Sequence, residues 1–270
     1  MSDQPRVYPG PRQILRYLRL EHHTLDDGSL VVTSPFLPDL ADAGGTMRLG
    51  AIAPACDYAA GVLANRIVHP DWLATQTFEL HLTQPVTSTV TALCKPLRAG
   101  RNSVLAEAVV QDESGAEVGR SFVTYARLPR RDDNPVPTPS TGRVDLTHPD
   151  EEPRLPFDEY LQLHTLNDQG GIDLDHHQRI CNSFGSIQGG AMAAILERAG
   201  SLAAEAVIGG PARSVSLSFH YAAQAREGPF HVDTQVLRHD STGIFARVQL
   251  VDGGIDHRLA AVGTVVAAPV

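Results

Sequence analysis

The chain has 270 residues, of which 42% are hydrophobic and 20% charged, with a formal net charge of −9. This length is sufficient for two hydrophobic cores, and the negative charge argues against nonspecific nucleic-acid binding. No stretch approaches the ~20 apolar residues of a membrane span, and the first residues lack the apolar run of a signal peptide. We therefore expect a cytoplasmic globular protein that binds neither nucleic acid nor membrane.

The first half is predicted to contain one long helix followed by strands. Residues 50–67 are rich in Ala and Gly, so this helix can lie very close to a surrounding sheet. The segments that follow alternate between apolar and polar residues and are joined by turn sequences such as DESGAE, which predicts antiparallel hairpins. These strands are expected at residues 75–82, 89–96, 102–112 and 117–128.

Residues 129–156 carry seven prolines and many charges, which predicts a partly extended linker. The linker divides the chain into an N-terminal domain, residues 1–128, and a C-terminal domain, residues 157–270. The second domain repeats the order of the first, with a helix over residues 189–207. Its strands are expected at residues 215–221, 230–238, 243–252 and 258–268. One near-central helix wrapped by an antiparallel sheet places each domain in the α+β class.

The two halves also share sequence. Residues 45–59, GTMRLGAIAPACDYA, align without a gap on residues 185–199, GSIQGGAMAAILERA, 140 positions later. Asp57 thereby falls on Glu197. A carboxylate on a buried helix face is costly without a purpose, so its retention at one register points to a site. The repeat extends to the flanking strands, which indicates two related domains and not a solenoid.

The block QGGAMAAILERA, residues 188–199, resembles the HGGxxxxLxDxA signature of hotdog-fold acyl-CoA thioesterases of the phenylacetate-pathway type. Asn182 and Ser214 match polar positions of that family. Gln188 stands where the family has histidine, and Glu197 where aspartate is commoner. In the first half Arg48 and Leu49 replace the His-Gly pair and Asp42 takes the place of Asn182, so this half is only a partial copy.

The resemblance implies two tandem hotdog domains packed as a pseudo-dimer, with each sheet wrapped around a central helix. It also implies hydrolysis of an acyl-CoA thioester without metal or redox cofactor, and a homo-oligomer of such chains. Basic residues that could contact the phosphates of coenzyme A are Lys95, Arg98, Arg101, Arg213 and Arg238.

Thioester hydrolysis needs an activated water or a nucleophile, and positive partial charge at the carbonyl oxygen. The N–H of Gly189 at a helix start can supply that charge, and a carboxylate can activate the water. Gly189 and Glu197 are about 12 Å apart along one helix, so each site must combine the helix start of one half with the acid of the other. Site A then comprises Asp57, Thr75, Asn182 and Gly189, and site B comprises Asp42, Leu49, Glu197 and Ser214.

We favour site A, because site B has a bulky Leu49 at the donor position and a second acid, Asp42, that would repel the developing negative charge. Structural readings compete with these assignments. Glu197 could be a solvated surface residue, and Thr75 and Ser214 could make only local hydrogen bonds. We take His81 and His220, which match each other in the repeat, as structural residues.

Other functions stay open at this point. Residues 173–179, DLDHHQR, lack a second ligand cluster and favour a solvated hairpin over a metal site. The three cysteines do not have metal-site spacing either. A hotdog-type hydratase or dehydratase is one alternative, although no Asp and His pair precedes either helix. A non-catalytic protein that binds acyl groups or acyl-CoA is the other.

Overall fold

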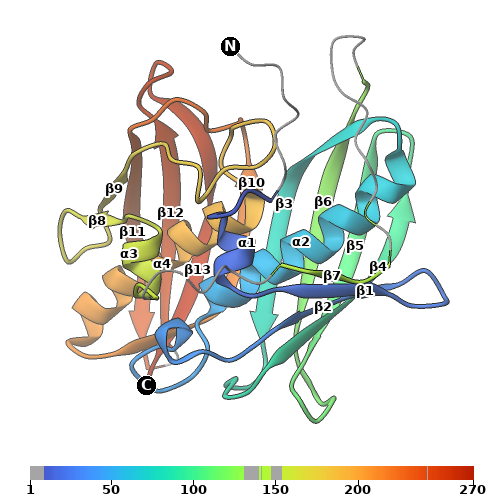
Figure 1. Cartoon of the computed structure of the whole chain (residues 1–270). Coiled ribbons are helices and arrows are strands. Elements are labelled where there is room, and N and C mark those ends of the chain that lie inside the picture. Colours follow the sequence, from blue (N-terminus) through green and yellow to red (C-terminus); the bar gives the residue numbers. More distant parts are fainter. Residues whose placement is uncertain (1–8, 131–139, 141, 147–153, 242) are drawn as a thin grey trace.

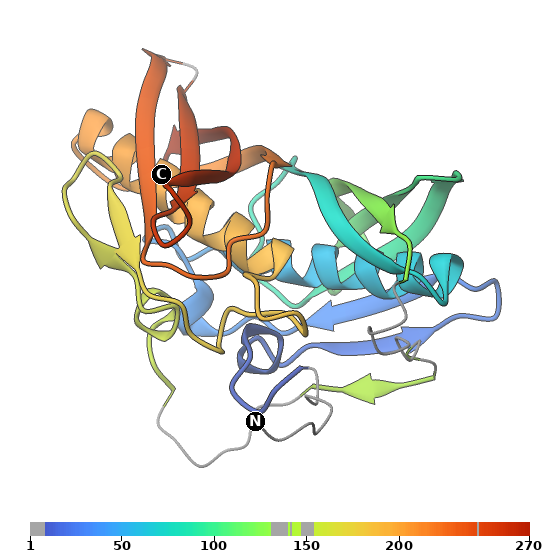
Figure 2. The ribbon, with the colours of Figure 1, turned by 90° about the horizontal axis from the view of Figure 1, so that it is seen from above.

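Two 20-residue helices, α2 (Leu49–Val68) and α4 (Gly189–Ile208), cross near their first turns and pack against the concave face of one large antiparallel sheet (Figures 1 and 2). The computed structural model describes residues 9–130, 140, 142–146, 154–241 and 243–270. Both helices begin and end within one residue of the positions predicted from the sequence. Their inward faces are lined mainly by alanine and glycine, as the sequence indicated.

Within the described residues the sheet has 13 strands, and apart from the 3-10 helix η1 of the first half and strand β7 (Val144–Asp145), the two halves have the same order of helices and strands. In the first half the elements besides α2 are α1 (Ile14–Tyr17), β1 (Glu21–Thr24), β2 (Leu30–Ser34), η1 (Pro38–Leu40), β3 (Trp72–Leu82), β4 (Val90–Ala99), β5 (Ser103–Gln111) and β6 (Glu117–Leu128). In the second half the elements besides α4 are α3 (Phe157–Tyr160), β8 (His164–Thr165), β9 (Ile172–Leu174), β10 (Ala212–Tyr221), β11 (Phe230–Asp240), β12 (Gly243–Asp252) and β13 (Arg258–Pro269).

With β7 (Val144–Asp145) at one edge, the strand order β7-β1-β2-β4-β5-β6-β3-β10-β13-β12-β11-β9-β8 is nearly mirrored about its middle. The two halves meet where β3 pairs antiparallel with β10, and Phe78 lies opposite Phe219 in that pairing. Both phenylalanines are fully buried. His81 and His220 lie on these junction strands, and the Nδ1 atom of His81 is 2.7 Å from the Ser216 hydroxyl.

The loops that lead into α2 and α4 are built in the same way. Asp42 and Asn182 each accept backbone N–H groups two and four residues ahead, which closes a tight loop. Gly45 and Gly185 follow at the same φ of 76°, a left-handed conformation that glycine adopts without steric cost. The chain then forms an isolated bridge back to its start before the helix begins.

Part of the predicted linker contributes to the fold. Strand β7 (Val144–Asp145) pairs with β1 at the edge of the sheet, and the carbonyl of Ser140 accepts hydrogen bonds from Arg66. Residues 131–139, 141 and 147–153 of this segment lie outside the described residues. Within the described ranges, no helix is long and apolar enough to cross a membrane.

We predict that Phe219→Ala lowers the free energy of unfolding by about 3–5 kcal/mol, because it leaves a cavity at the strand pair that joins the two halves. Leu237→Ala on β11 is the matched control. Leu237 is 50% exposed, so its truncation should change stability by no more than about 0.5 kcal/mol. Urea denaturation measures both. Equal effects of the two substitutions would show that the junction is not a packed core.

Candidate active site

Asp57 is a buried carboxylate at the contact between the two helices, with only 5% of its surface exposed. Its Oδ2 atom accepts the backbone N–H of Gly190 at the start of α4, at 3.0 Å, and the side-chain amide of Gln188. Its Oδ1 atom accepts the hydroxyls of Tyr125 at 2.9 Å and Thr75 at 3.3 Å. An acid from the first half is therefore held against the helix start of the second half.

Gln188 has two tasks at this contact. It is the N-cap residue of α4, and its Oε1 atom accepts the Ala191 N–H at 2.7 Å while its Nε2 group donates to Asp57. Gly189 stands directly beside the carboxylate. A Cβ atom at Gly189 would lie 2.8 Å from Thr75 Oγ1 and 2.9 Å from Asp57 Oδ1, so any side chain there would block the approach to the acid.

The electrostatics of this cluster are set by burial. Removal from water raises the pKa of the Asp57 carboxyl above its ordinary value, and its four hydrogen-bond donors oppose the rise. Burial likewise raises the pKa of Tyr125 and Tyr221 well above the ordinary tyrosine value, and the Asp57 charge adds to the rise in both. Both phenols therefore stay protonated and serve as donors. The Tyr221 hydroxyl donates to the Gly189 carbonyl at 2.8 Å.

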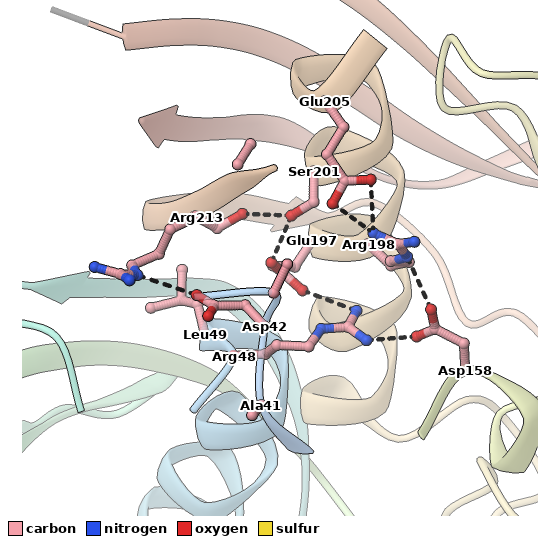
Figure 3. Close-up of a pocket in the computed structure, with 13 residues that line it drawn as sticks. Ala41, Asp42, Arg48, Leu49, Asp158, Glu197, Arg198, Ser201, Glu205 and Arg213 are labelled. Atoms are coloured by element: carbon pink, nitrogen blue, oxygen red, sulfur yellow. Dashed lines mark hydrogen bonds and ion pairs between the residues drawn. The ribbon is translucent and has the colours of Figure 1, made fainter. Parts of the chain in front are cut away.

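We call the place where the acid of one helix meets the start of the other a helix-to-acid contact. At the second such contact, between Glu197 and the start of α2, the carboxylate has different partners (Figure 3). Glu197 of α4 is 2% exposed and lies against the start of α2, where a Cβ atom at Gly50 would come within 2.6 Å of its Oε2 atom. Its Oε1 atom accepts the Ser201 hydroxyl at 2.8 Å, and Ser201 is in turn 2.7 Å from the Ser214 hydroxyl. The Oε2 atom lies 3.5 Å from the guanidinium of Arg48.

A cavity of about 250 Å³ opens beside Glu197, and four residues predicted for site B line it, namely Asp42, Leu49, Glu197 and Ser214. Arginines and acids pair around it. Arg48 bonds Asp158 at 2.6 Å, Arg198 bonds the same acid at 2.8 Å, and Arg213 bonds Asp42 at 3.0 Å (Figure 3). The cavity therefore lies at site B, which the sequence analysis did not favour, and ion pairs line it.

The structure brings Asp57, Thr75 and Gly189 together but uses the side chain of Asn182 elsewhere. Both ends of the Asn182 amide bond within its own loop, to Ser186 and to the Phe184 N–H. Asp42 makes the corresponding loop in the first half, which explains why both positions are polar.

Sequence reasoning missed the roles of Gln188, Tyr125, Arg48 and Ser201. Gln188 and Arg48 precede the two helices at matching positions of the repeat, so their location was visible but their contacts were not. Tyr125 lies 68 positions from Asp57 in the chain, and no local pattern links them.

Several other predicted positions can now be placed. Three of the five basic residues suggested for phosphate contacts pair with acids, namely Lys95 with Asp27, Arg213 with Asp42 and Arg238 with Asp240. In the segment 173–179, Asp173 bonds His231 at 2.7 Å. Among the residues that the structure describes, no three His, Cys, Asp or Glu side chains gather as a group that could hold a metal ion.

Comparison with known proteins agrees with the sequence resemblance. Residues 184–257 match the model of the thioesterase superfamily. An acyl-ACP thioesterase from Bacteroides thetaiotaomicron superposes with a TM-score of 0.57 at 12% identity, over 88% of this chain and 98% of that one. The tesB protein of Mycobacterium avium subs paratuberculosis gives 0.63 at 11% identity, over 94% and 96%. The 12:0-ACP thioesterase from Umbellularia californica gives 0.61 at 12% identity, over 90% and 94%.

No curated protein matches the chain. The fold is a hotdog-type thioesterase fold with a large antiparallel sheet, and the resemblance to thioesterases predicted from residues 188–199 is confirmed.

We predict that Asp57→Asn makes the folded protein more stable than the wild type at pH 8. A carboxyl whose pKa is raised in the folded state favours folding while it is protonated, and this contribution is lost as the pH rises through the folded-state pKa. The advantage of the variant should therefore vanish as the pH falls below the ordinary Asp pKa of about 3.9. Urea denaturation over a pH series measures it, and a less stable variant at pH 8 would contradict the account.

Proposed function

We propose that the protein hydrolyses an acyl-CoA thioester to the free acid and coenzyme A, with Asp57 as general base at site A. The observation that carries the proposal is the placement of this buried carboxylate against Gly189 and Gly190 at the start of α4. The match of residues 184–257 to the thioesterase superfamily and the thioesterase fold support thioester hydrolysis in general.

In this mechanism the thioester carbonyl approaches Gly189, whose lack of a side chain lets Asp57 and Thr75 lie directly against the start of α4, and the first N–H groups of that helix provide positive partial charge. Asp57 takes a proton from a water molecule, and the water oxygen attacks the carbonyl carbon. The tetrahedral intermediate then collapses, the C–S bond breaks, and the proton held by Asp57 passes to the departing thiolate. No redox cofactor or metal is needed to balance this reaction.

The attacking water must donate a hydrogen bond to Asp57. Each oxygen of this carboxylate already accepts two hydrogen bonds, so one of the four must be displaced. The bond from Thr75 is the longest of those measured, at 3.3 Å, and it lies on the side of Gly189. Water can displace this bond at the least cost, after which the Thr75 hydroxyl is free to orient the same water. This gives Thr75 a positioning role.

A cavity opens beside Glu197, but site A is preferred to site B because of the residue at the donor position and the partner of the acid. Leu49 stands where Gly189 stands and is buried, and Arg48 stands where Gln188 stands and neutralises Glu197. Glu197 therefore faces a cation, whereas Asp57 accepts hydrogen bonds from neutral donors. We assign Glu197 and Ser214 to this structural cluster and not to the chemistry, and we assign Asn182 to the loop that places Gly189.

We also propose that the two halves, residues 1–128 and 157–270, are tandem hotdog units packed as a pseudo-dimer. The register of the junction supports this. Leu80 pairs with Leu217 and Phe78 with Phe219, so a shift of 139 positions maps one pair onto the other, as a local two-fold axis requires. Assembly of several such chains stays a prediction.

A second function is favoured by one observation. All acceptor positions of Asp57 are filled and its side chain is nearly inaccessible, which also suits a protein that binds acyl-CoA without cleaving it. Such a protein would bind a thioester and release it intact.

The test is release of free thiol from a panel of acyl-CoA esters by the wild type and three variants. We expect Asp57→Asn to lower kcat by roughly 10²-fold or more, the scale of a lost general base. Gly189→Val should lower it by ~10²–10³-fold, because it blocks the carbonyl site. Glu197→Gln is the matched control at the other helix contact and should retain most of the activity.

Two outcomes would contradict this assignment. Loss of turnover in Glu197→Gln with full turnover in Asp57→Asn would place the reaction at site B. Stoichiometric binding of acyl-CoA without thiol release by the wild type would establish the binding function instead.

A further inference from the structure

Tyr125 reaches the candidate site from β6, the neighbour of β3 within the first half. It lies on β6 directly across from Thr75 of β3, and only 2% of its surface is exposed. Its hydroxyl is 2.7 Å from the backbone carbonyl of Asp57 and 2.9 Å from Oδ1 of the same residue. One hydroxyl group thus contacts both the main chain and the carboxylate of the proposed base.

Helix α2 provides the room for this contact. Gly61 follows Asp57 by one helical turn, and a Cβ atom there would lie 3.3 Å from the Tyr125 hydroxyl oxygen and 3.7 Å from Cζ. A larger residue would push the hydroxyl away from the helix. The pairing of a buried tyrosine with a glycine at this position indicates that the contact is built into the packing.

The second half lacks this arrangement. The counterpart of Tyr125 is Ala267, which lies across from Ser214 as Tyr125 lies across from Thr75 and carries no hydroxyl, and the residue corresponding to Gly61 is Ser201. Glu197 takes its hydrogen bond from Ser201 on its own helix. The tyrosine donor therefore distinguishes site A from its structural counterpart, as Gly189 does.

Among the described residues, the groups that donate to the Asp57 carboxylate are all neutral. They come from β3 (Thr75), β6 (Tyr125) and the start of α4 (Gln188 and Gly190). The other titratable groups that face it are the phenol of Tyr221 on β10 and the thiol of Cys56 on α2. Because no cation is among these donors, the ionised form of Asp57 is stabilised by the neutral hydrogen bonds. The loss of any one of them should therefore have a larger effect than it would beside a cation.

We propose that Tyr125 is a positioning residue that holds Asp57 ionised and aimed at Gly189 through its hydroxyl. As part of a catalytic site this rests on the proposed thioesterase function, but the contact itself can be measured without turnover. A hydrogen bond to a charged acceptor contributes more than one between neutral groups, so its loss must change the titration of Asp57 in the resting protein.

The experiment compares the wild type with Tyr125→Phe, which removes only the hydroxyl. The carboxyl band of Asp57 is followed by infrared spectroscopy against pH, with Asp57→Asn as the blank. We expect the pKa of Asp57 to be higher in Tyr125→Phe by roughly one to two units. Tyr58→Phe is the matched control, because its hydroxyl contacts His22 and not Asp57. This control should leave the titration unchanged.

The same variants are then assayed for thiol release as a function of pH. In Tyr125→Phe the acidic limb of kcat/KM should move to higher pH by the same interval, a change that a merely structural residue would not produce. Gly61→Ala, which crowds the hydroxyl, should shift the titration in the same direction by a smaller amount and serves if Tyr125→Phe does not fold.

An unchanged Asp57 titration in both Tyr125→Phe and Gly61→Ala would overturn the proposal whatever the activity. A shifted titration in a protein that hydrolyses no thioester would uphold the contact and refute the thioesterase function, so the two failures can be told apart.

Discussion

The close crossing of α2 and α4 is the constraint on which the rest of the molecule depends. A Cβ atom at Gly190 would lie 2.4 Å from the Pro54 Cα atom, and one at Gly50 would lie 3.2 Å from the Ala194 Cα atom. Only small residues allow two helices to approach this closely. The crossing brings the start of each helix to the acid of the other, and the sheet curves around the two crossed helices.

This crossing buries two carboxylates, and burial without partners would be too costly to tolerate. The two halves meet the same requirement by different means. Asp57 receives neutral donors, which keep it satisfied and leave its basicity high because burial raises its pKa. Glu197 lies 3.5 Å from the guanidinium of Arg48 and accepts the Ser201 hydroxyl, so its partners are a cation and its own helix. The two contacts therefore differ in the charge of their partners, although their helices occupy matching positions of the repeat.

Much of the architecture could be predicted from the sequence because it depends on local pattern. The two long helices and the eight strands that follow them were located to within a few residues, since alternation and small-residue runs are read over short windows. The short strands β1, β2, β8 and β9 were not, because two to five residues carry too little pattern. Repeated sequence together with the length of a helix was enough to infer that each acid faces the opposite helix start.

The remaining features of the site arise from contacts between distant segments. Tyr125 donates from β6 to Asp57 of α2, and Arg48 joins Glu197 to Asp158 of α3. Asn182 looks like a catalytic amide in the sequence, but the hydrogen bonds of its own loop account for it. Which side chain meets which is decided by packing, and a single sequence does not contain that information.

The central claim is that only one of the two helix-to-acid contacts in each chain accepts an acyl thioester. Calorimetric titration with a non-hydrolysable thioether analogue of acyl-CoA tests it directly, because the analogue binds without turnover. The account predicts one equivalent bound per chain in the wild type and none in Gly189→Val. Two equivalents per chain, or one equivalent that survives in Gly189→Val, would contradict it.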